Sequence, residues 1–245
     1  MNRLRYHEIV ETDHDIQNPM SPAKLRRVID YLRLRDGERI IDVGSGKGWL
    51  MHEIAATHRV AVTGLEFSRV FAAAARARLA SATLLGSAEI VLGPALDFQL
   101  PKLPFDVGLC IGATFALNDF EGTLDWMARA VRPGGRIAIG EPFMTPPFPD
   151  VVRGRWPEYQ RTPADIGQAI QQRGYELTGL VAASEDDWDH YECQHWRAAA
   201  DWLRVNPNDP DAAELAAKNE AGRADYLEIE RSCYGWAIFV AEKTA

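Results

Sequence analysis

The 245-residue chain has few cysteines, and the three present, Cys110, Cys193 and Cys233, are far apart and form no C-x-x-C pair. An odd, scattered set argues against a disulfide framework and against a zinc site built from thiolates. The sequence also lacks an N-terminal signal-peptide core, and no apolar run approaches the length of about 18 residues expected of a membrane helix. We therefore predict a cytoplasmic protein with no membrane segment and no bound metal.

Positive charge is also scarce. Lys and Arg number 27 against 35 Asp and Glu, so the formal net charge is −8. The short basic stretch KLRRV, residues 24–28, is typical of the exposed side of a helix. Binding to a nucleic acid needs a basic stripe, and none is present. We therefore predict a small-molecule partner and no nucleic-acid partner, and the sequence leaves the oligomeric state open.

Short apolar bursts alternate with helical patterns over the first 142 residues. Strands of a parallel sheet joined by crossover helices produce this alternation. Each burst ends near glycine, which is typical of a buried strand. The pattern predicts helices over residues 22–34, 50–57, 68–84 and 122–135, and strands over residues 39–44, 59–67, 88–93, 105–113 and 136–141.

The pattern changes after residue 142. A proline-rich irregular loop is expected over 143–163, then a helix over 164–173 and a strand over 175–183. Residues 185–231 are helical in pattern with a break at NPNDPD, and 234–243 form a last strand. The prediction is an α/β fold: a Rossmann-like, doubly wound, mostly parallel seven-stranded sheet with helices on both faces. A helical cap is inserted between the last two strands, because so long a connection usually serves a site.

The stretch RIIDVGSGKGWL, residues 39–50, has glycines at 44, 46 and 48 between a strand and a helix. Such a turn lets backbone N–H groups and the helix N-terminus approach a ligand that carries oxygens. The dinucleotide fingerprint G-x-G-x-x-G would need a third glycine where Trp49 stands, and the phosphate-loop pattern is absent. The loop therefore favours a ligand other than a dinucleotide.

A carboxylate follows in the next predicted strand. Glu66 ends that strand, where it would face the crevice and could accept hydrogen bonds from both hydroxyls of a ribose. Loop and acid together fit a nucleoside ligand. The alternative is that Glu66 only caps the helix that starts near Ser68.

At this point the sequence resembles the class I S-adenosylmethionine-dependent methyltransferases. The resemblance covers about residues 39–142 and rests on IIDVGSGKG, GLEFS, FDVGLCIGATFAL and ARAVRPGGRIAIGEP. The flanking stretches ETDHDIQNPMSPAKL, DDWDHYECQHW and ERSCYGW resemble a bacterial subfamily of unassigned substrate. The resemblance implies one methyltransferase domain over 1–245. Its parts would be an N-terminal lid and first helix (1–37), a cofactor-binding core (38–142), a substrate-side segment (143–184), a helical cap (185–232) and the last strand (233–245).

The resemblance also implies a cofactor site for S-adenosylmethionine, with S-adenosylhomocysteine as product. The glycine loop would surround the amino-acid end, Glu66 would take the ribose hydroxyls, and Ile111 and Gly112 would line the methyl side. The family usually has an acid after the third strand for the adenine amino group, where this chain has Pro94. Either Asp97 substitutes for it or the backbone alone holds adenine. The implied cofactor residues are Asp42, Gly44, Ser45, Gly46, Gly48, Glu66, Phe67, Asp97, Ile111 and Gly112.

Several side chains could face a methyl acceptor. His14 and Asn18 lie in the expected lid, although His14 could equally be a surface histidine. Glu141 directly follows the fifth strand and is either an acceptor-site acid or a structural hydrogen-bonding group. We predict His14 and Glu141 as catalytic residues. The cap residues Trp188, Tyr191 and His195, with Glu192, share one helical face, which is either an acceptor wall or a packing seam.

The predicted function is methyl transfer from S-adenosylmethionine to a small-molecule acceptor by in-line displacement at the methyl carbon. A different transfer from the sulfonium remains open. The alternative from another class is a non-catalytic S-adenosylmethionine-binding accessory or sensor protein, which Pro94 favours. A nicotinamide-dependent oxidoreductase is disfavoured by Trp49, because a bulky residue there prevents the close helix approach that a pyrophosphate needs.

Overall fold

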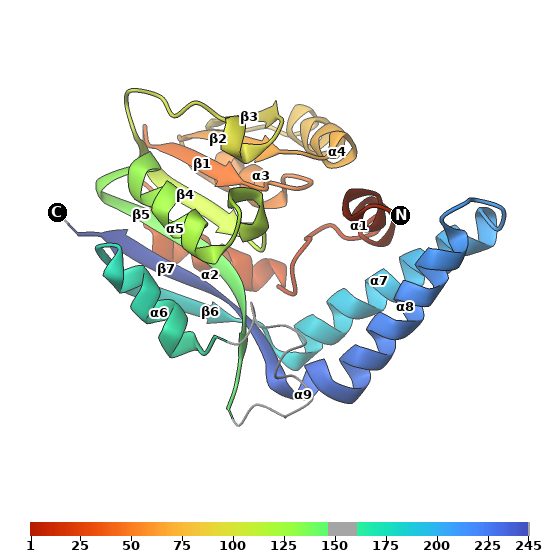
Figure 1. The fold of residues 1–245 in the computed structure, drawn as a ribbon. Helices are drawn as coiled ribbons and strands as arrows, with labels where there is room; N and C mark the ends of the chain where they lie inside the picture. Colours follow the sequence, from red (N-terminus) through yellow and green to blue (C-terminus); the bar gives the residue numbers. More distant parts are fainter. Residues whose placement is uncertain (147–160, 245) are drawn as a thin grey trace.

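The computed structural model describes residues 1–146 and 161–244. A central sheet separates two layers of helices, and a pair of long helices extends from one end of the sheet (Figure 1). The strands are β1 (Arg39–Val43), β2 (Ala61–Glu66), β3 (Ser87–Leu92), β4 (Phe105–Ile111), β5 (Val131–Met144), β6 (Tyr175–Ala182) and β7 (Tyr234–Lys243). The longer helices are α1 (Arg3–Val10), α2 (Pro22–Leu32), α3 (Trp49–Thr57), α4 (Arg69–Ala80), α5 (Phe120–Ala130), α6 (Pro163–Gln172), α7 (Glu185–Val205) and α8 (Ala212–Asp225). Short helical turns are η1 (Ala95–Asp97), η2 (Thr114–Leu117), η4 (Tyr226–Glu230) and α9 (Arg231–Cys233).

The seven strands have the order β3-β2-β1-β4-β5-β7-β6. Strands β1 to β5 pair in parallel, whereas β7 runs antiparallel to both β5 and β6. This confirms the predicted mostly parallel sheet and the pairing of its last two strands. Because the order reverses between β1 and β4, the carboxyl ends of these strands open a crevice where ligands bind in such sheets.

Both faces of the sheet are covered by the apolar sides of helices. Leu25, Val28 and Ile29 of α2 pack with residues of α3 against one face. Leu124 of α5 and Ile170 of α6 pack against the other. Strands buried on both faces read as continuous apolar runs, which is why the bursts in the sequence located them.

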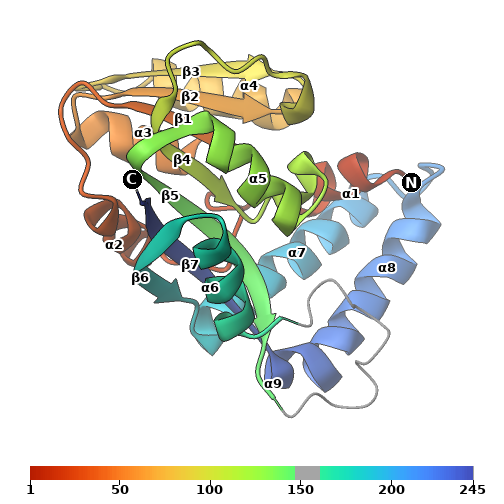
Figure 2. The ribbon, with the colours of Figure 1, turned by 60° about the vertical axis from the view of Figure 1, so that its left-hand side comes forward.

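The connection between β6 and β7 carries α7, α8, η4 and α9, as the predicted cap. In Figures 1 and 2, α7 and α8 lie side by side and point away from the sheet. Helix α1 packs against α7, where Ile9 and Val10 form a small buried cluster with Ala199 and Leu215. The chain's N-terminal segment is thereby brought between the sheet and the cap.

Several boundaries differ from the sequence expectations. Helix α4 ends at Ala80, four residues before the predicted end at Leu84, and α5 ends at Ala130, five residues before the predicted end at residue 135. Strand β5 begins at Val131, which pairs with Phe105 of β4, and it extends to Met144 because β7 pairs along it from Arg136 to Met144. Helix α1 was not predicted, since its apolar side chains follow no helical period. The predicted irregular loop loses its first residues to β5, and its residues 147–160 lie outside the described chain.

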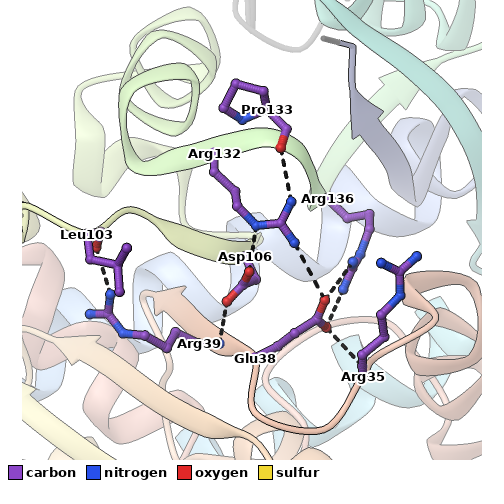
Figure 3. A network of polar contacts seen from close by, with 8 residues as sticks. All are labelled: Arg35, Glu38, Arg39, Leu103, Asp106, Arg132, Pro133 and Arg136. Atoms are coloured by element: carbon purple, nitrogen blue, oxygen red, sulfur yellow. Dashed lines mark hydrogen bonds and ion pairs between the residues drawn. The ribbon is translucent and has the colours of Figure 1, made fainter.

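The amino ends of β1, β4 and β5 meet in a network of ion pairs (Figure 3). Glu38 is held by Arg136 through two hydrogen bonds, of 2.9 Å and 2.5 Å, and both side chains are almost fully buried. Asp106 accepts from the backbone N–H of Arg39 at 2.8 Å and from Nε of Arg132 at 2.6 Å. This network lies at the end of the sheet opposite the crevice. Among the described residues, no helix combines the length and apolar character needed to cross a membrane.

Candidate active site

A cavity of about 1090 Å³ lies at the carboxyl ends of the parallel strands. The segments that follow β1, β2, β4 and β5 supply one side of its lining, and α1, α7 and the start of β7 supply the other. Ligand cavities are usually about 300–1000 Å³. The cavity is therefore large enough for two small molecules at once.

The glycine loop forms the sheet side of this cavity. Gly44 and Gly46 line it with φ angles of +69° and +55°, a region that side chains with a Cβ rarely adopt. A Cβ on Gly44 would lie 2.2 Å from Cβ of Ala113, and one on Gly46 would lie 2.2 Å from Oε1 of Gln17. The loop therefore needs glycine for its backbone conformation and for the close approach of neighbouring side chains.

Two buried acids support the loop. The Glu66 carboxylate accepts from the backbone N–H of Gly46 at 2.8 Å and from that of Ser68 at 2.7 Å. Burial raises the pKa of Glu66 despite these hydrogen bonds. Burial, with a smaller contribution from the negative charge of Glu66, raises the pKa of Asp42 to about 7. Glu66 lines the cavity, so the structure combines the two interpretations made from the sequence, a ligand-facing acid and an acid that bonds the backbone before α4.

The N-terminal segment is fastened to the same loop. Nζ of Lys47 donates to three backbone carbonyls, those of Glu11 at 2.6 Å, Thr12 at 2.7 Å and His14 at 2.9 Å. The backbone N–H of Lys47 donates to Oε1 of Gln17 at 2.7 Å, and Nε2 of Gln17 donates to Glu11 at 2.5 Å. Because carbonyls at a helix end attract cations, Lys47 fixes the end of α1 over the cavity.

Glu141 is the buried acid farther along the cavity, at the position where β5 passes the crevice. Its Oε1 accepts from the hydroxyl of Thr114 at 2.7 Å. Burial raises the pKa of Glu141 to about 7, although the Thr114 hydrogen bond and the positive charge of Arg161 act to lower it. A carboxylate with a pKa near 7 is suited to accept a proton under physiological conditions.

The cap contributes the aromatic wall. Trp188, Tyr191, Glu192 and His195 all line the cavity from one face of α7. The ring centroids of Trp188 and Tyr191 lie 6.2 Å apart in a T-shaped arrangement, and those of Tyr191 and His195 lie 4.5 Å apart. The predicted face of the cap helix is thus turned toward the crevice.

Sixteen site residues were predicted, and the structure brings most of them together. Asp42 and Ser45 line a smaller hollow of about 60 Å³ that shares Gly44 and Gly46 with the main cavity. Eleven line the main cavity: Asn18, Gly44, Gly46, Glu66, Phe67, Ile111, Gly112, Glu141, Trp188, Tyr191 and His195.

Three predicted residues lie elsewhere. His14 is 1% exposed and does not line the cavity. Its Nε2–H donates to the carbonyl of Tyr191 at 2.9 Å, and its ring lies 4.5 Å from that of His195. Burial, then the nearby His195, lowers the pKa of His14 to about 4. Nζ of Lys47 donates to the backbone carbonyl of His14, and the imidazole ring packs behind the aromatic wall rather than facing the cavity.

Asp97 and Gly48 are the other two. Asp97 is exposed on η1 and absent from the lining, which instead contains Gly93 and Ala95 of the same segment. A contact between Asp97 and adenine is therefore not supported. Gly48 caps the start of α3 with a φ of +73° and faces Ala75 rather than the cavity. Its role is to turn the chain from loop to helix.

Sequence reasoning missed the lining residues of α1 and the residues that follow β4. Thr114 and Phe115 could have been found, because they directly follow a strand whose carboxyl end opens the crevice. The residues of α1 carry no comparable signal, since distant contacts determine their place. The missed residues are Arg3, Leu4 and His7 of α1 and Glu11, which follows its last turn. Within the described ranges, no group of three or more His, Cys, Asp or Glu side chains could hold a metal ion.

Residues 40–135 match the family model of the methyltransferase domain. The chain is 30% identical to the uncharacterized protein YjhP of Escherichia coli K12 over 98% of both chains, and the X-ray structure of YjhP gives a TM-score of 0.90. A crystal structure of a SAM-dependent methyltransferase from Geobacter sulfurreducens, in complex with S-adenosyl-L-homocysteine, has 32% identity, a TM-score of 0.88 and 97% coverage of both chains. An O-methyltransferase of Pyrenophora dematioidea is 30% identical over 68% of this chain and 67% of its own.

The fold and the crevice define a Rossmann-like α/β enzyme whose ligands bind at the carboxyl ends of a parallel sheet. With these similarities over its full length, the chain belongs to the S-adenosylmethionine-dependent methyltransferases.

Proposed function

We propose that the protein transfers a methyl group from S-adenosylmethionine to a small molecule held between Glu141 and helix α7. The observation that carries this proposal is the continuity of the cavity. One space is lined by the glycine loop and Glu66 at one end, and by Glu141, Trp188 and Tyr191 at the other. A donor and an acceptor that share one cavity can be held in line for displacement at the methyl carbon.

The residues at the sheet end fit the proposed cofactor. Gly44 and Gly46 line the cavity where its amino-acid end would lie, and Glu66 can accept from ribose hydroxyls with the lone pairs that Gly46 and Ser68 do not use. Phe67 is 58% exposed on the lining, and an exposed aromatic ring there would cover the adenine. When bound, S-adenosylmethionine supplies a methyl group that is already activated by the sulfonium.

The protein's own contribution is then position, exclusion of water and removal of a proton. Orientation of two reactants can lower a barrier by about 7–11 kcal/mol in favourable systems. An acceptor that enters with a proton needs a base, and general-base catalysis contributes a factor of about 10²–10⁴. Glu141 is the proposed base, with Thr114 orienting its carboxylate through the 2.7 Å hydrogen bond.

Calorimetric titration with S-adenosylmethionine and S-adenosylhomocysteine tests the first half of the proposal, and transfer of labelled methyl to a panel of small acceptors tests the second. Micromolar binding of both nucleosides is expected. Glu141→Gln should keep the affinity for S-adenosylhomocysteine while turnover falls by about 10²–10⁴. Binding without transfer to any acceptor would favour the non-catalytic alternative. No binding of either nucleoside would overturn the proposal.

A further inference from the structure

The cap side of the cavity differs in chemistry from the sheet side. Five aromatic residues of the cap and β7 line it: Trp188, Tyr191, Tyr226, Tyr234 and Trp236. The centroid of the Trp188 ring lies 6.2 Å from that of Tyr191 and 6.4 Å from that of Tyr226, so three rings meet at one corner. The hydroxyl of Tyr226 donates to Asp189 at 2.7 Å, which fixes this ring in place. The result is a preorganised aromatic corner.

Carboxylates accompany these rings. Glu185, Glu192 and Glu230 line the cavity from the same helical segments, and among the described residues these segments supply one lining guanidinium, that of Arg231. Arg3 and Arg161 line the cavity from outside the cap. Arg231 is already engaged, because its Nε and Nη2 donate to Asp189 at 2.8 Å and 3.0 Å. Its Nη2 also lies 3.4 Å from Glu185. The positive charge on this wall is therefore neutralised by residues of the cap itself.

Glu192 is the carboxylate without such compensation. Its side chain is 18% exposed, and its Oε2 lies 3.7 Å from Nδ1 of His195. Across the described residues, no ion pair between Glu192 and a lysine or arginine is found. A carboxylate with low exposure beside aromatic rings produces a negative potential that attracts cations.

The aromatic wall and the proposed base share one cavity. Trp236 of β7 pairs with Pro142 of β5, directly after Glu141, and both Trp236 and Glu141 line the cavity. Because successive side chains of a strand point to opposite faces, Trp236 and Glu141 border this cavity from different faces of the sheet. A cation bound by the wall therefore lies in the same cavity as the carboxylate that can take its proton.

We propose that the methyl acceptor is an amine, which binds as its ammonium ion against the rings of Trp188, Tyr191 and Tyr226 and the carboxylate of Glu192, and is methylated at nitrogen. This inference rests on the proposed function and assigns the substrate class of the same site. The O-methyltransferase from Pyrenophora dematioidea does not assign it, because its similarity leaves about a third of this chain unmatched.

Methyl transfer to an amine begins with the loss of the ammonium proton. The ammonium gives a proton to the carboxylate of Glu141 and becomes a neutral amine with a free lone pair. This lone pair forms the nitrogen–carbon bond to the methyl group while the carbon–sulfur bond breaks and its electron pair returns to sulfur. The positive charge passes from sulfur to nitrogen, and Glu141 releases its proton to water.

Three matched probes test the charge preference: phenethylamine, 2-phenylethanol and phenylacetate. They share a ring and a chain length, and at neutral pH they carry a positive charge, no charge and a negative charge. Each is titrated calorimetrically into the full-length protein saturated with S-adenosylhomocysteine. We expect phenethylamine to bind at least about tenfold more tightly than 2-phenylethanol, the scale of one cation–π contact with a nearby carboxylate. Phenylacetate should bind most weakly.

Two variants locate the effect. Glu192→Gln and Trp188→Leu should each weaken phenethylamine by about tenfold and leave 2-phenylethanol within about twofold. Glu228→Gln is the matched control, because Glu228 is exposed on η4 and absent from the lining, and it should change neither affinity. Labelled methyl should accumulate on amines rather than on matched alcohols.

The outcomes separate the two proposals. If S-adenosylhomocysteine binds but 2-phenylethanol equals phenethylamine, or phenethylamine fails to bind at millimolar concentration, the acceptor is not an ammonium and the methyltransferase proposal stands. If S-adenosylhomocysteine itself does not bind, the methyltransferase proposal fails first.

Discussion

Carboxylates of low exposure lie at both ends of the sheet, and their surroundings differ between the two ends. At the amino ends, Glu38 and Asp106 are each hydrogen-bonded to a guanidinium group. Burial acts to raise the pKa of Asp106, but the N–H of Arg39 and the guanidinium of Arg132 outweigh it and lower the pKa. At the carboxyl ends, burial raises the pKa of Asp42 and of Glu141 to about 7.

The difference follows from what each end does. A fully paired carboxylate needs no ligand, so the network in Figure 3 can close one end of the sheet on its own. An acid that has to bind a ligand or exchange a proton must keep part of its hydrogen-bonding capacity for that purpose, and the folded protein is less stable for it. Changes at the two ends should therefore alter different measurements.

Removal of the guanidinium at the amino end should have the largest effect. Arg136→Met leaves Glu38 buried beside the more distant Arg132, whose Nη2 lies 3.9 Å away. Breaking a buried pair on one side typically destabilises a protein by about 3–5 kcal/mol. We expect a loss of this size in the free energy of unfolding, measured in urea. The affinity for S-adenosylhomocysteine should remain within about twofold of the wild-type value.

The double variant Glu38→Met with Arg136→Met is the control for this prediction. Apolar replacement of a whole buried pair is often neutral or stabilising. The double variant should therefore recover most of the stability lost in Arg136→Met. If the single variant loses less than about 1 kcal/mol, the pair behaves like an exposed one, and the contrast between the ends is weaker than the burial suggests.

The glycine loop offers the next largest effect. Gly46→Val should lower the affinity for S-adenosylhomocysteine by more than about 100-fold, or about 2.7 kcal/mol, because the added Cβ would lie 2.2 Å from Oε1 of Gln17 and would displace the loop that lines the cofactor end of the cavity. Gly37→Val is the matched control. Gly37 has a similar φ of +83° but nothing within 4 Å of an added Cβ. Backbone strain should thus be similar in both variants, and only Gly46→Val should lose the ligand. Equal affinities, measured by calorimetry, would show that the loop holds something else.

Glu66 is expected to have a smaller effect. Glu66→Ala removes the acceptor for the N–H groups of Gly46 and Ser68 together with the proposed ribose contact. Hydrogen bonds to charged groups contribute about 1.5–3 kcal/mol, so the affinity for S-adenosylhomocysteine should fall by that amount. Thr162→Ala, which removes the N-cap of α6, should lower only the free energy of unfolding, by about 1 kcal/mol. If Glu66→Ala behaved like this control, Glu66 would be a helix cap without a ribose contact.

The sequence predicted the sheet and the glycine loop because both depend on local signals. Strands buried on both faces are apolar throughout, and glycine marks where each one turns toward the crevice. Helical spacing also predicted that Trp188, Tyr191 and His195 share one face of α7. These signals also identified Asp42, Glu66 and Glu141, since each lies within a strand or at its end.

The remaining features depend on contacts between distant parts of the chain. Helix α1 owes its place to Ile9 and Val10, which pack against Ala199 and Leu215 of the cap. The burial of His14 depends on the hydrogen bonds from Lys47, and no local sequence pattern predicts these hydrogen bonds. Strand β5 extends beyond its predicted end because β7, from the end of the chain, pairs with it. The spacing of residues within one segment does not predict contacts with distant segments.

The dependence of stability on pH compares the two ends of the sheet most directly. Because the folded-state pKa of Asp42 is about 7, the folded protein keeps a proton that the unfolded chain releases above pH 4. The contribution of Asp42 to stability is therefore present at low pH and is lost as the pH rises from about 4 to about 7, by at most about 1.4 kcal/mol per pH unit. Asp42→Asn avoids this loss, so its stability relative to the wild type should increase across that window and stay constant above it.

Asp106→Asn should give the opposite sign. Because the pKa of Asp106 is lowered in the folded protein, its contribution to stability is present at higher pH and is lost as the pH falls through the folded-state value. The free energy of unfolding of Asp106→Asn should therefore lie furthest below that of the wild type at neutral pH. Urea titrations of both variants and the wild type at several pH values from about 3 to about 8, a range that extends below the ordinary aspartate pKa of about 3.9, would test this. A pH-independent difference for Asp42→Asn would mean that Asp42 ionises in the fold without penalty. In that case the carboxyl end of the sheet would be as well compensated as the amino end, and burial alone could not explain why ligands bind there.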